Sequence, residues 1–459
     1  ITLYPGVPSA DEKEPFQEYL KYVQDLKTRE PIDPEALVKG ELPPGTPGID
    51  GPFKVEESMV RYFNKKYDME NPLLHDKDYA IKAGYKDIQA YFTYTSYPQL
   101  LKPYPAQARG TLLVSQIQSS INSFKPIYPG DTLYVVCEDA DIVDLTPQEG
   151  SLYRSLQISG KGTAYNQHGE KVQEMFSSCM ESVKVYKPGL KPENMTFQDV
   201  WEDPDWMSRP AHYYTDEDWE FIFDIWRNEK RRGAEPLYWE DVKIGDEPQI
   251  TTDGPILEGP LPSFEYGMGI GGSKNLKLEM LNPDIFKTMI RDPETGLYYM
   301  PDEKDWKPIV PCEIKEHKTE AGVVDETDIH KKTESRGVLL NFVGRDIAIR
   351  HINNWMGDHG WITNISWNIM PPETHAAYGK PVPKALGYKN YLDNVPYMKG
   401  KIVNAHGLST DLPIVRSYVH NKYVKNGEHL VELAWWIETI DKYIFIAGNA
   451  TVRLPSRHA

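Results

Sequence analysis

Apolar residues in this chain follow two spacings, and the change from one to the other marks where helices give way to strands. The opening segment has an i, i+3, i+4, i+7 apolar stripe that predicts a helix, carried by Phe16, Tyr19, Leu20, Val23 and Leu26. Alternating strand patterns follow at 111–120, 131–139, 153–165 and 171–186. A turn signal at 166–169 joins the last two as a hairpin. A helix followed by antiparallel strands predicts an α+β unit, with a sheet wrapped round a helix.

The same outline returns after a break at 187–211, which is rich in Pro, Asp and Trp. An amphipathic helix is expected to begin after Thr215, which suits the N-cap position with Asp218 three residues on, and to continue to the basic residues 230–232. A long helix is then predicted from about 342 to 356. Strands are expected at 361–370, 398–405, 414–425, 430–439 and 444–453.

The pattern therefore indicates a duplicated fold without strong sequence identity between the copies. With 459 residues the chain is too long for one ordinary core. Two sheets paired edge to edge within one chain would leave no pairing edge exposed between them. The predicted domains are an N-terminal helical extension and loop (1–53), a first unit (54–187), a linker with a helix (188–236) and a second unit (237–459).

The composition and charge of the chain disfavour some classes of binding partner. The net charge of −17 disfavours nucleic acid and anionic membranes. No stretch has the roughly 18 uncharged apolar residues that span a bilayer, and the N-terminus lacks a signal pattern. The three cysteines, Cys137, Cys179 and Cys312, have no Cys-x-x-Cys spacing and are expected to be reduced and buried. These features predict a soluble, cytoplasmic protein.

Residues that could take part in catalysis cluster between positions 68 and 80. Acids, a histidine and an Asn-Pro turn lie there between two helical patterns. A carboxylate and a histidine on one loop, held by a proline that fixes φ, could activate or deliver a water molecule. The same residue types are also common in loops without catalytic function. Composition alone favours that second interpretation.

A resemblance to a known family favours the catalytic interpretation of this loop. The segment 56–84 has a helix-like 58–63, then Asn71-Pro72-Leu73-Leu74-His75-Asp76, Tyr79-Ala80 and Gly84, and it resembles the hydratase motif of MaoC-like dehydratases. These are hotdog-fold enzymes that act on acyl-CoA thioesters. The segments 354–361 and 450–457 resemble the long branch of that superfamily, in which one chain carries two hotdog units. The resemblance extends over most of the chain beyond about residue 55 and weakens between about 262 and 320.

The resemblance implies an acyl-CoA hydratase or dehydratase that needs no cofactor and no metal. His75 is expected to give or take the proton, with Asp68 as its carboxylate partner, while Asn71 fixes the loop or the water. Main-chain N–H groups at the start of a central helix would bind the thioester oxygen, which gives Tyr91, Phe92 and Gly344 as candidate substrate-binding residues. Family behaviour also implies a homodimer or a higher homo-oligomer.

The motif departs from the usual Asp-x-Asn-Pro-x-His spacing by one residue on each side of Asn71. Asp68, Glu70 and Asp76 therefore all remain candidates for the carboxylate. The first copy also has Ala90 where the family often has a glycine, so its oxyanion donor stays open. In the second copy, Val324 and Asp325 fall opposite His75 and Asp76, which predicts one working site and one degenerate unit.

Two other functions stay open, a hotdog acyl-CoA thioesterase and a non-catalytic acyl-CoA-binding subunit. Several other features are given structural interpretations. Residues 357–360 are expected to be a glycine-rich helix stop, and His351 a packed histidine. Residues 267–272 are expected to form a loop near the pocket. His406, His420 and His429 lack the spacing of a zinc site.

Overall fold

The structure is a computed structural model that describes residues 10–96, 111–144, 153–184, 210–255, 272–300, 341–369, 389–405, 407–408 and 410–458. Its helices include α1 (Ala10–Thr28), α2 (Pro34–Lys39), α3 (Glu57–Tyr67), α4 (Lys77–Lys82), α5 (Asp216–Asn228), α7 (Gly272–Leu281), α8 (Pro283–Phe286) and α10 (Asn341–Met356). Short 3₁₀ turns lie at Pro72–Leu74, Tyr94–Ser96, Trp239–Asp241, Tyr391–Asn394 and Pro396–Met398.

The strands of the first half are β1 (Ile49–Lys54), β2 (Thr111–Ser123), β3 (Thr132–Asp144), β4 (Tyr153–Tyr165) and β5 (Lys171–Lys184). Those of the second half are β6 (Thr251–Thr252), β7 (Ile290–Arg291), β8 (Tyr298–Tyr299), β9 (Trp361–Asn368), β10 (Ile414–Lys425), β11 (Glu428–Glu438) and β12 (Ile444–Arg453). The bounds of β4, β10 and β12 are those predicted from the sequence. The fold class is α+β, as predicted.

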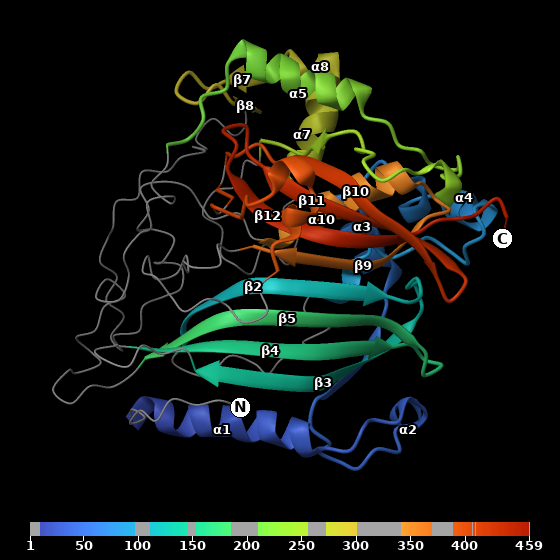
Figure 1. Ribbon diagram of the computed structural model, residues 1–459, viewed down its shortest axis with the longest axis vertical. Helices are drawn as coiled ribbons and strands as arrows, with labels where there is room; N and C mark the ends of the chain where they lie inside the picture. The colour runs from blue at the N-terminus through green and yellow to red at the C-terminus, as the bar shows by residue number, and fades with distance from the viewer. Residues whose placement is uncertain are drawn as a thin grey trace.

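One sheet runs through both halves of the chain in the order β1-β3-β4-β5-β2-β9-β12-β11-β10-β6 (Figure 1). The halves meet at an antiparallel β2–β9 pair, with Gln118 opposite Asn368 and Ile121 opposite Ile365. This is the edge-to-edge pairing that the duplicated pattern predicts. The domain boundaries derived from that pattern stay a prediction.

Helix α10 is the centre of the second half. It packs against β10, β11 and β12, and its Ile347, Ala348, Ile349 and Ile352 are buried in a core that also contains Ile121 of β2. The same helix buries Arg345, Arg350 and His351. Buried polar groups require hydrogen-bonding partners. Other polar side chains must therefore lie next to these three residues of α10.

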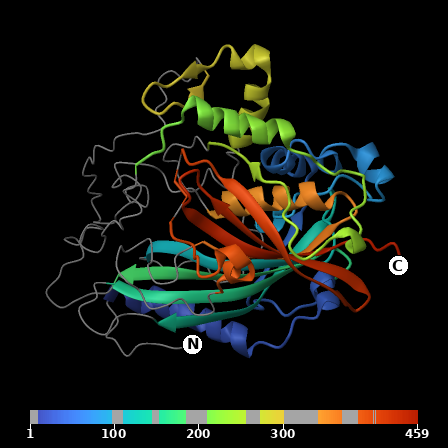
Figure 2. The ribbon, with the colours of Figure 1, turned by 45° about the horizontal axis from the view of Figure 1, so that its top comes forward.

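The helices at the two ends of the sheet lie far apart (Figures 1 and 2). Helix α1 covers the outer part of the first half, where Tyr19, Val23 and Leu26 pack with Ile142 of β3. At the other end α5 packs through Trp219 and Trp226 into a cluster with Met280 and Leu297. No helix in the described part of the chain is long and apolar enough to cross a membrane.

Two sequence predictions need correction. Helix α5 has the predicted cap, a capping box of Thr215 and Asp218, but it ends at Asn228 because Glu229 is extended (φ −60°, ψ 123°). Lys230, Arg231 and Arg232 therefore lie beyond the helix.

The segment 398–405 is not a strand of the sheet. It follows a 3₁₀ turn that begins with Pro396. Its Val403 packs on the sheet against Ala434 and Trp436 together with Leu392 and Val395. The N–H of Asn404 donates to the carbonyl of Ile444 at the start of β12 (2.9 Å). The segment forms no strand, however, and its apolar spacing reflects a layer that covers the sheet.

The two cysteines in the described part of the chain, Cys137 and Cys179, are buried thiols outside any disulfide, as predicted. Burial raises the pKa of the Cys137 thiol to about 12, so this group is protonated and unreactive. Cys312 lies outside the described residues.

Candidate functional site

The loop after α3 is held by a buried asparagine. The side chain of Asn64 donates to the main-chain oxygens of Leu74 (2.7 Å) and Gln89 (2.8 Å) and accepts from the N–H of Tyr91 (2.9 Å). One side chain therefore connects the motif loop to the segment that carries Tyr91. Asn71 fixes the loop locally, since its Oδ1 accepts from the N–H of Leu73 and caps the 3₁₀ turn that follows.

His75 reaches Asp68 through the main chain. Its Nε2 lies 2.8 Å from the carbonyl oxygen of Asp68. A carbonyl oxygen only accepts hydrogen bonds, so Nε2 carries a proton and Nδ1 is left as the acceptor of the neutral ring. The imidazole is half-buried.

The carboxylate of Asp68 has a different partner. It is 1% exposed, and its Oδ1 lies 2.5 Å from Nη2 of Arg231. Arg231 belongs to the connection after α5, so this ion pair joins the motif loop to the linker. The two groups predicted to act together, His75 and the Asp68 carboxylate, are thus linked through the peptide of Asp68 and not by a direct side-chain hydrogen bond.

Behind this ion pair lies a buried charge network centred on Glu229. The Glu229 carboxylate binds Nζ of Lys277 at 2.8 Å and Nδ2 of Asn354 at 2.6 Å, and it also pairs with Arg350. Arg350 in turn lies 2.8 Å from Asp253. Three buried acids (Asp68, Glu229 and Asp253) and the exposed Glu70 therefore meet three cations (Arg231, Lys277 and Arg350).

The other two candidate carboxylates of the loop are also engaged. Glu70 accepts from Nζ of Lys277 at 2.7 Å. Asp76 caps α4, with its Oδ1 accepting from the N–H of Tyr79 at 3.0 Å, and is exposed. All three acids that the sequence leaves open thus have structural roles.

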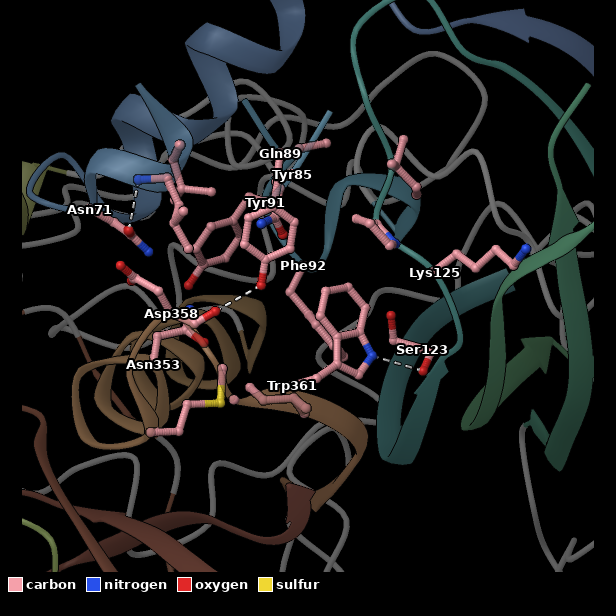
Figure 3. Close-up of a pocket in the computed structure, with 18 of the residues that line it drawn as sticks. Asn71, Tyr85, Gln89, Tyr91, Phe92, Ser123, Lys125, Asn353, Asp358 and Trp361 are labelled. Carbon is pink, nitrogen blue, oxygen red and sulfur yellow. Dashed lines mark hydrogen bonds between the residues drawn. The ribbon is translucent and has the colours of Figure 1, made fainter. Parts of the chain in front are cut away.

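A pocket opens beside the loop, between the first half and the C-terminal end of α10 (Figure 3). Its cavity volume is about 70 Å³. Predicted residues Asn71, Tyr91 and Phe92 line it, together with Asp358 and Trp361 from the second half. Asp68, His75 and Gly344 are not among its lining residues, although His75 directly follows Leu74, which is.

Tyr91 is fixed from both sides. Its hydroxyl donates to the main-chain oxygen of Asp346 at 2.7 Å, and its ring stacks on Tyr67 with centroids 5.0 Å apart. Burial, followed by the nearby Asp346, raises the pKa of Tyr91 well above its ordinary value, so the hydroxyl keeps its proton. Tyr91 is therefore a rigid wall of the pocket.

The main-chain amides at the site of the missing glycine are already used. The N–H of Ala90 donates to the carbonyl of Ile127 (2.8 Å), and that of Tyr91 donates to Asn64. These two N–H groups are not available to an oxyanion in this arrangement. Gly344 packs away from the pocket, where an added Cβ would lie 3.3 Å from Cγ2 of Ile446.

Sequence reasoning missed Asp358 as a pocket residue. Gly357 has φ 72° and ends α10 as the predicted helix stop. The turn nevertheless directs Asp358, 6% exposed, to the pocket. The adjacent acid and histidine at 358–359 were the sequence signal for a functional residue here. The hydrogen-bonding partners of Asp358 lie 273 and 279 residues away in the chain, so the sequence does not show that they meet.

The remaining candidates have simpler roles. His351 is packed as predicted, 1% exposed, with Nδ1 3.0 Å from the hydroxyl of Thr251 and Nε2 2.8 Å from that of Ser417. Within the described ranges no three His, Cys, Asp or Glu side chains are placed to hold a metal ion. The counterpart of the motif at 323–326, the glycines at 267–271 and His406 lie outside the described residues.

Similarity to known proteins is found in the structure of the chain and not in its sequence. No protein-family model matches the chain, and no curated protein does. The solved structures similar to it include MaoC-like dehydratases. One described as a MaoC-like dehydratase is 15% identical with a TM-score of 0.45, over 89% of this chain and 98% of that one.

Two further structures are similar over comparable lengths. A putative MaoC domain dehydratase from Chloroflexus aurantiacus is 12% identical with a TM-score of 0.42, over 89% of this chain and 94% of that one. A conserved hypothetical protein from Mycobacterium tuberculosis, described as having a double hotdog fold, is 10% identical with a TM-score of 0.39, over 90% and 97%. A fold alone does not specify a function, which depends on the residues of the site.

Proposed function

We propose that this protein is an acyl-CoA hydratase or dehydratase, which reversibly adds water to a 2-enoyl-CoA thioester to give a 3-hydroxyacyl-CoA. The observation that carries the proposal is the position of Asn71. This residue belongs to the Asn-Pro-Leu-x-His loop and lines a pocket that both halves of the chain build. The loop with the motif therefore borders the cavity in which we propose that the substrate binds.

The pocket walls suit an acyl group. Phe92, Met356 and Trp361 provide apolar surface, and a few polar groups, among them Asn71 and Gln89, lie between them. Ligand pockets are commonly built this way, with apolar walls and a small number of polar groups that fix orientation. In this proposal Tyr91 and Phe92 contact the acyl chain.

His75 is the proposed acid–base group of the loop, and Asn71 holds the loop in place. Histidine suits this role as a residue type because the ordinary pKa of an imidazole lies near neutral pH. The reaction needs no cofactor. A homo-oligomer in the cytoplasm is part of the same proposal.

The test uses a panel of 2-enoyl-CoA thioesters and two readouts, loss of the enoyl absorbance and release of free thiol. Wild type is expected to consume the enoyl group without releasing thiol. His75→Ala should lower kcat/KM by about 10²–10⁴, the usual contribution of a general acid or base. His168→Ala, at the exposed β4–β5 turn, is the matched control and should retain wild-type activity.

One observation favours a second function, a non-catalytic acyl-CoA-binding subunit. The Asp68 carboxylate pairs with Arg231 and is not hydrogen-bonded to His75. Saturable binding of acyl-CoA with neither readout changing would support this alternative and exclude the hydratase. Thiol release would instead identify a thioesterase.

A further inference from the structure

Water addition to an enoyl thioester requires a base placed beside the substrate, and a carboxylate is a common choice. The three candidate carboxylates of the motif loop already bind other groups of the protein. Asp68 pairs with Arg231 at 2.5 Å, Glu70 with Lys277 at 2.7 Å, and Asp76 caps α4. Each of these acids would have to give up its present partner before it could serve as a base in the pocket.

Asp358 is placed differently. It lines the same pocket as Asn71 but comes from the opposite half of the chain (Figure 3). Its main chain is fixed on both sides, because its N–H donates to the carbonyl of Gly233 (2.9 Å) and its carbonyl accepts from the hydroxyl of Tyr85 (2.8 Å). The carboxylate therefore projects from a rigid position.

The side chain of Asp358 is held by one hydroxyl. Its Oδ2 accepts from Tyr79 at 2.5 Å. Burial, together with the hydrogen bond to Asp358, raises the pKa of Tyr79 to about 12, so Tyr79 acts as a donor near neutral pH. The partner of the Asp358 carboxylate is this hydroxyl, and the nearby Arg231 pairs with Asp68 instead. The Asp358 carboxylate is therefore oriented by a neutral hydroxyl group.

Both tyrosines come from the segment that carries the motif. Tyr79 lies in α4 and Tyr85 follows it, and both hydroxyls bind the turn after α10. The first half thus positions an acid of the second half. The arrangement is therefore built from both halves of the chain.

We infer that Asp358, and not Asp68, is the carboxylate that activates water in the reaction proposed above. The inference rests on that proposed function. Asp358 takes a proton from water as the water oxygen forms its bond to the β-carbon, and the Cα=Cβ electron pair moves to the thioester enolate. The resulting carboxylic acid then returns the proton, through the imidazole of His75, to the α-carbon as the enolate collapses. One H₂O is added, and the carboxylate is regenerated.

The experiment measures kcat and KM on the 2-enoyl-CoA panel for wild type, Asp358→Asn, Asp68→Asn and Asp284→Asn in the full chain. Asp358→Asn keeps an oxygen acceptor for Tyr79 and is expected to lower kcat by about 10²–10⁴ while Kd for a saturated acyl-CoA stays within about threefold. Asp68→Asn is expected to lower kcat less than about tenfold. Asp284, whose side chain is 85% exposed, is the surface control and should behave as wild type.

A second variant tests the role of Tyr79. Tyr79→Phe removes the hydrogen bond that favours the ionised carboxylate, so the acidic limb of the kcat profile should move to higher pH. Turnover by wild type with full kcat in Asp358→Asn would overturn this inference and leave the proposed function standing. A complete loss in Asp68→Asn with Asp358→Asn active would do the same. No turnover by wild type on any enoyl-CoA would overturn both.

Discussion

Arg231 and Asp68 form a buried ion pair in which Nη2 lies 2.5 Å from Oδ1. The side chains are 16% and 1% exposed. Arg231 comes from the connection after α5 and Asp68 from the end of α3, so the pair attaches the linker to the motif loop. The main-chain oxygen of the same aspartate binds His75. Arg231 and His75 therefore both contact Asp68, one through its carboxylate and the other through its main chain.

The first prediction concerns the stability supplied by this pair. Asp68→Ala leaves the guanidinium of Arg231 without its partner in a largely dry site, and breaking a buried pair by removing one side costs about 3–5 kcal/mol. Urea unfolding should show this loss. The double variant Asp68→Ala, Arg231→Met should recover part of it, because the uncompensated charge is gone.

The exposed pair of Arg61 and Glu57 provides the matched comparison. Surface pairs contribute about 0–1 kcal/mol, so Glu57→Ala should be nearly neutral. An Asp68→Ala loss no larger than that of Glu57→Ala would show that the buried pair does not stabilise the fold.

The second prediction concerns pH. Burial, and then the charge of Arg350, lowers the pKa of His351 from 6.5 to about 3. The unfolded chain therefore binds a proton at this residue between these values and the folded chain does not. Stability contributed by neutral His351 is complete above pH 6.5 and is lost as the pH falls towards 3, by about 1.4 kcal/mol per pH unit.

This contribution is isolated by comparing wild type with His351→Asn at about pH 7 and about pH 5. The advantage of wild type in unfolding free energy should shrink by about 2 kcal/mol between them. His168→Asn, at an exposed turn, should show no such change. A constant difference between wild type and His351→Asn would mean that His351 titrates equally in both states.

Two glycines test how tightly α10 and the sheet are packed. At Gly448 a Cβ would collide with the carbonyl of Ser366 and the ring of Trp435. Gly448→Ala should therefore destabilise by at least about 1–3 kcal/mol. At Gly344 the nearest atom is a side-chain methyl at 3.3 Å, and alanine is favoured over glycine in a helix by about 1 kcal/mol.

Gly344→Ala is therefore expected to lie within about 1 kcal/mol of wild type and to retain turnover, since this position does not line the pocket. Thermal unfolding and the enoyl-CoA assay measure both effects. A selective loss of turnover in Gly344→Ala would restore this residue as a substrate contact, as the sequence suggests.

Helices and strands whose ends depend on nearby residues could be predicted from the sequence. The ends of β4, β10 and β12 follow from alternation and turn residues, and the cap of α5 follows from the Thr215–Asp218 spacing. The segment 398–405 has a similar apolar pattern but lies on top of the sheet. Alternation records burial on one side, and it does not distinguish a paired strand from a covering layer.

The site was harder to predict because its partners are far apart in the chain. The loop 68–76 is recognisable locally, and Asn71 does reach the pocket. The contacts of Asp68 with Arg231 and of Tyr79 with Asp358 span 163 and 279 residues. No periodicity links such positions, and the helix-stop interpretation of 357–360 is correct for Gly357 while it conceals the role of Asp358.

The last prediction concerns the acyl-binding wall. Phe92 lines the pocket, is half-buried and carries no group that could take part in proton transfer. Truncation to alanine removes apolar contact that substrate and transition state share, and full burial of a Phe side chain contributes about 1.5–3 kcal/mol. Phe92→Ala should therefore raise KM for a long-chain or aromatic enoyl-CoA about tenfold or more and leave kcat within about threefold. Phe221→Ala, on the outer side of α5 and 38% exposed, should change neither constant. An equal fall of kcat and kcat/KM in Phe92→Ala would instead place this ring against the reacting atoms.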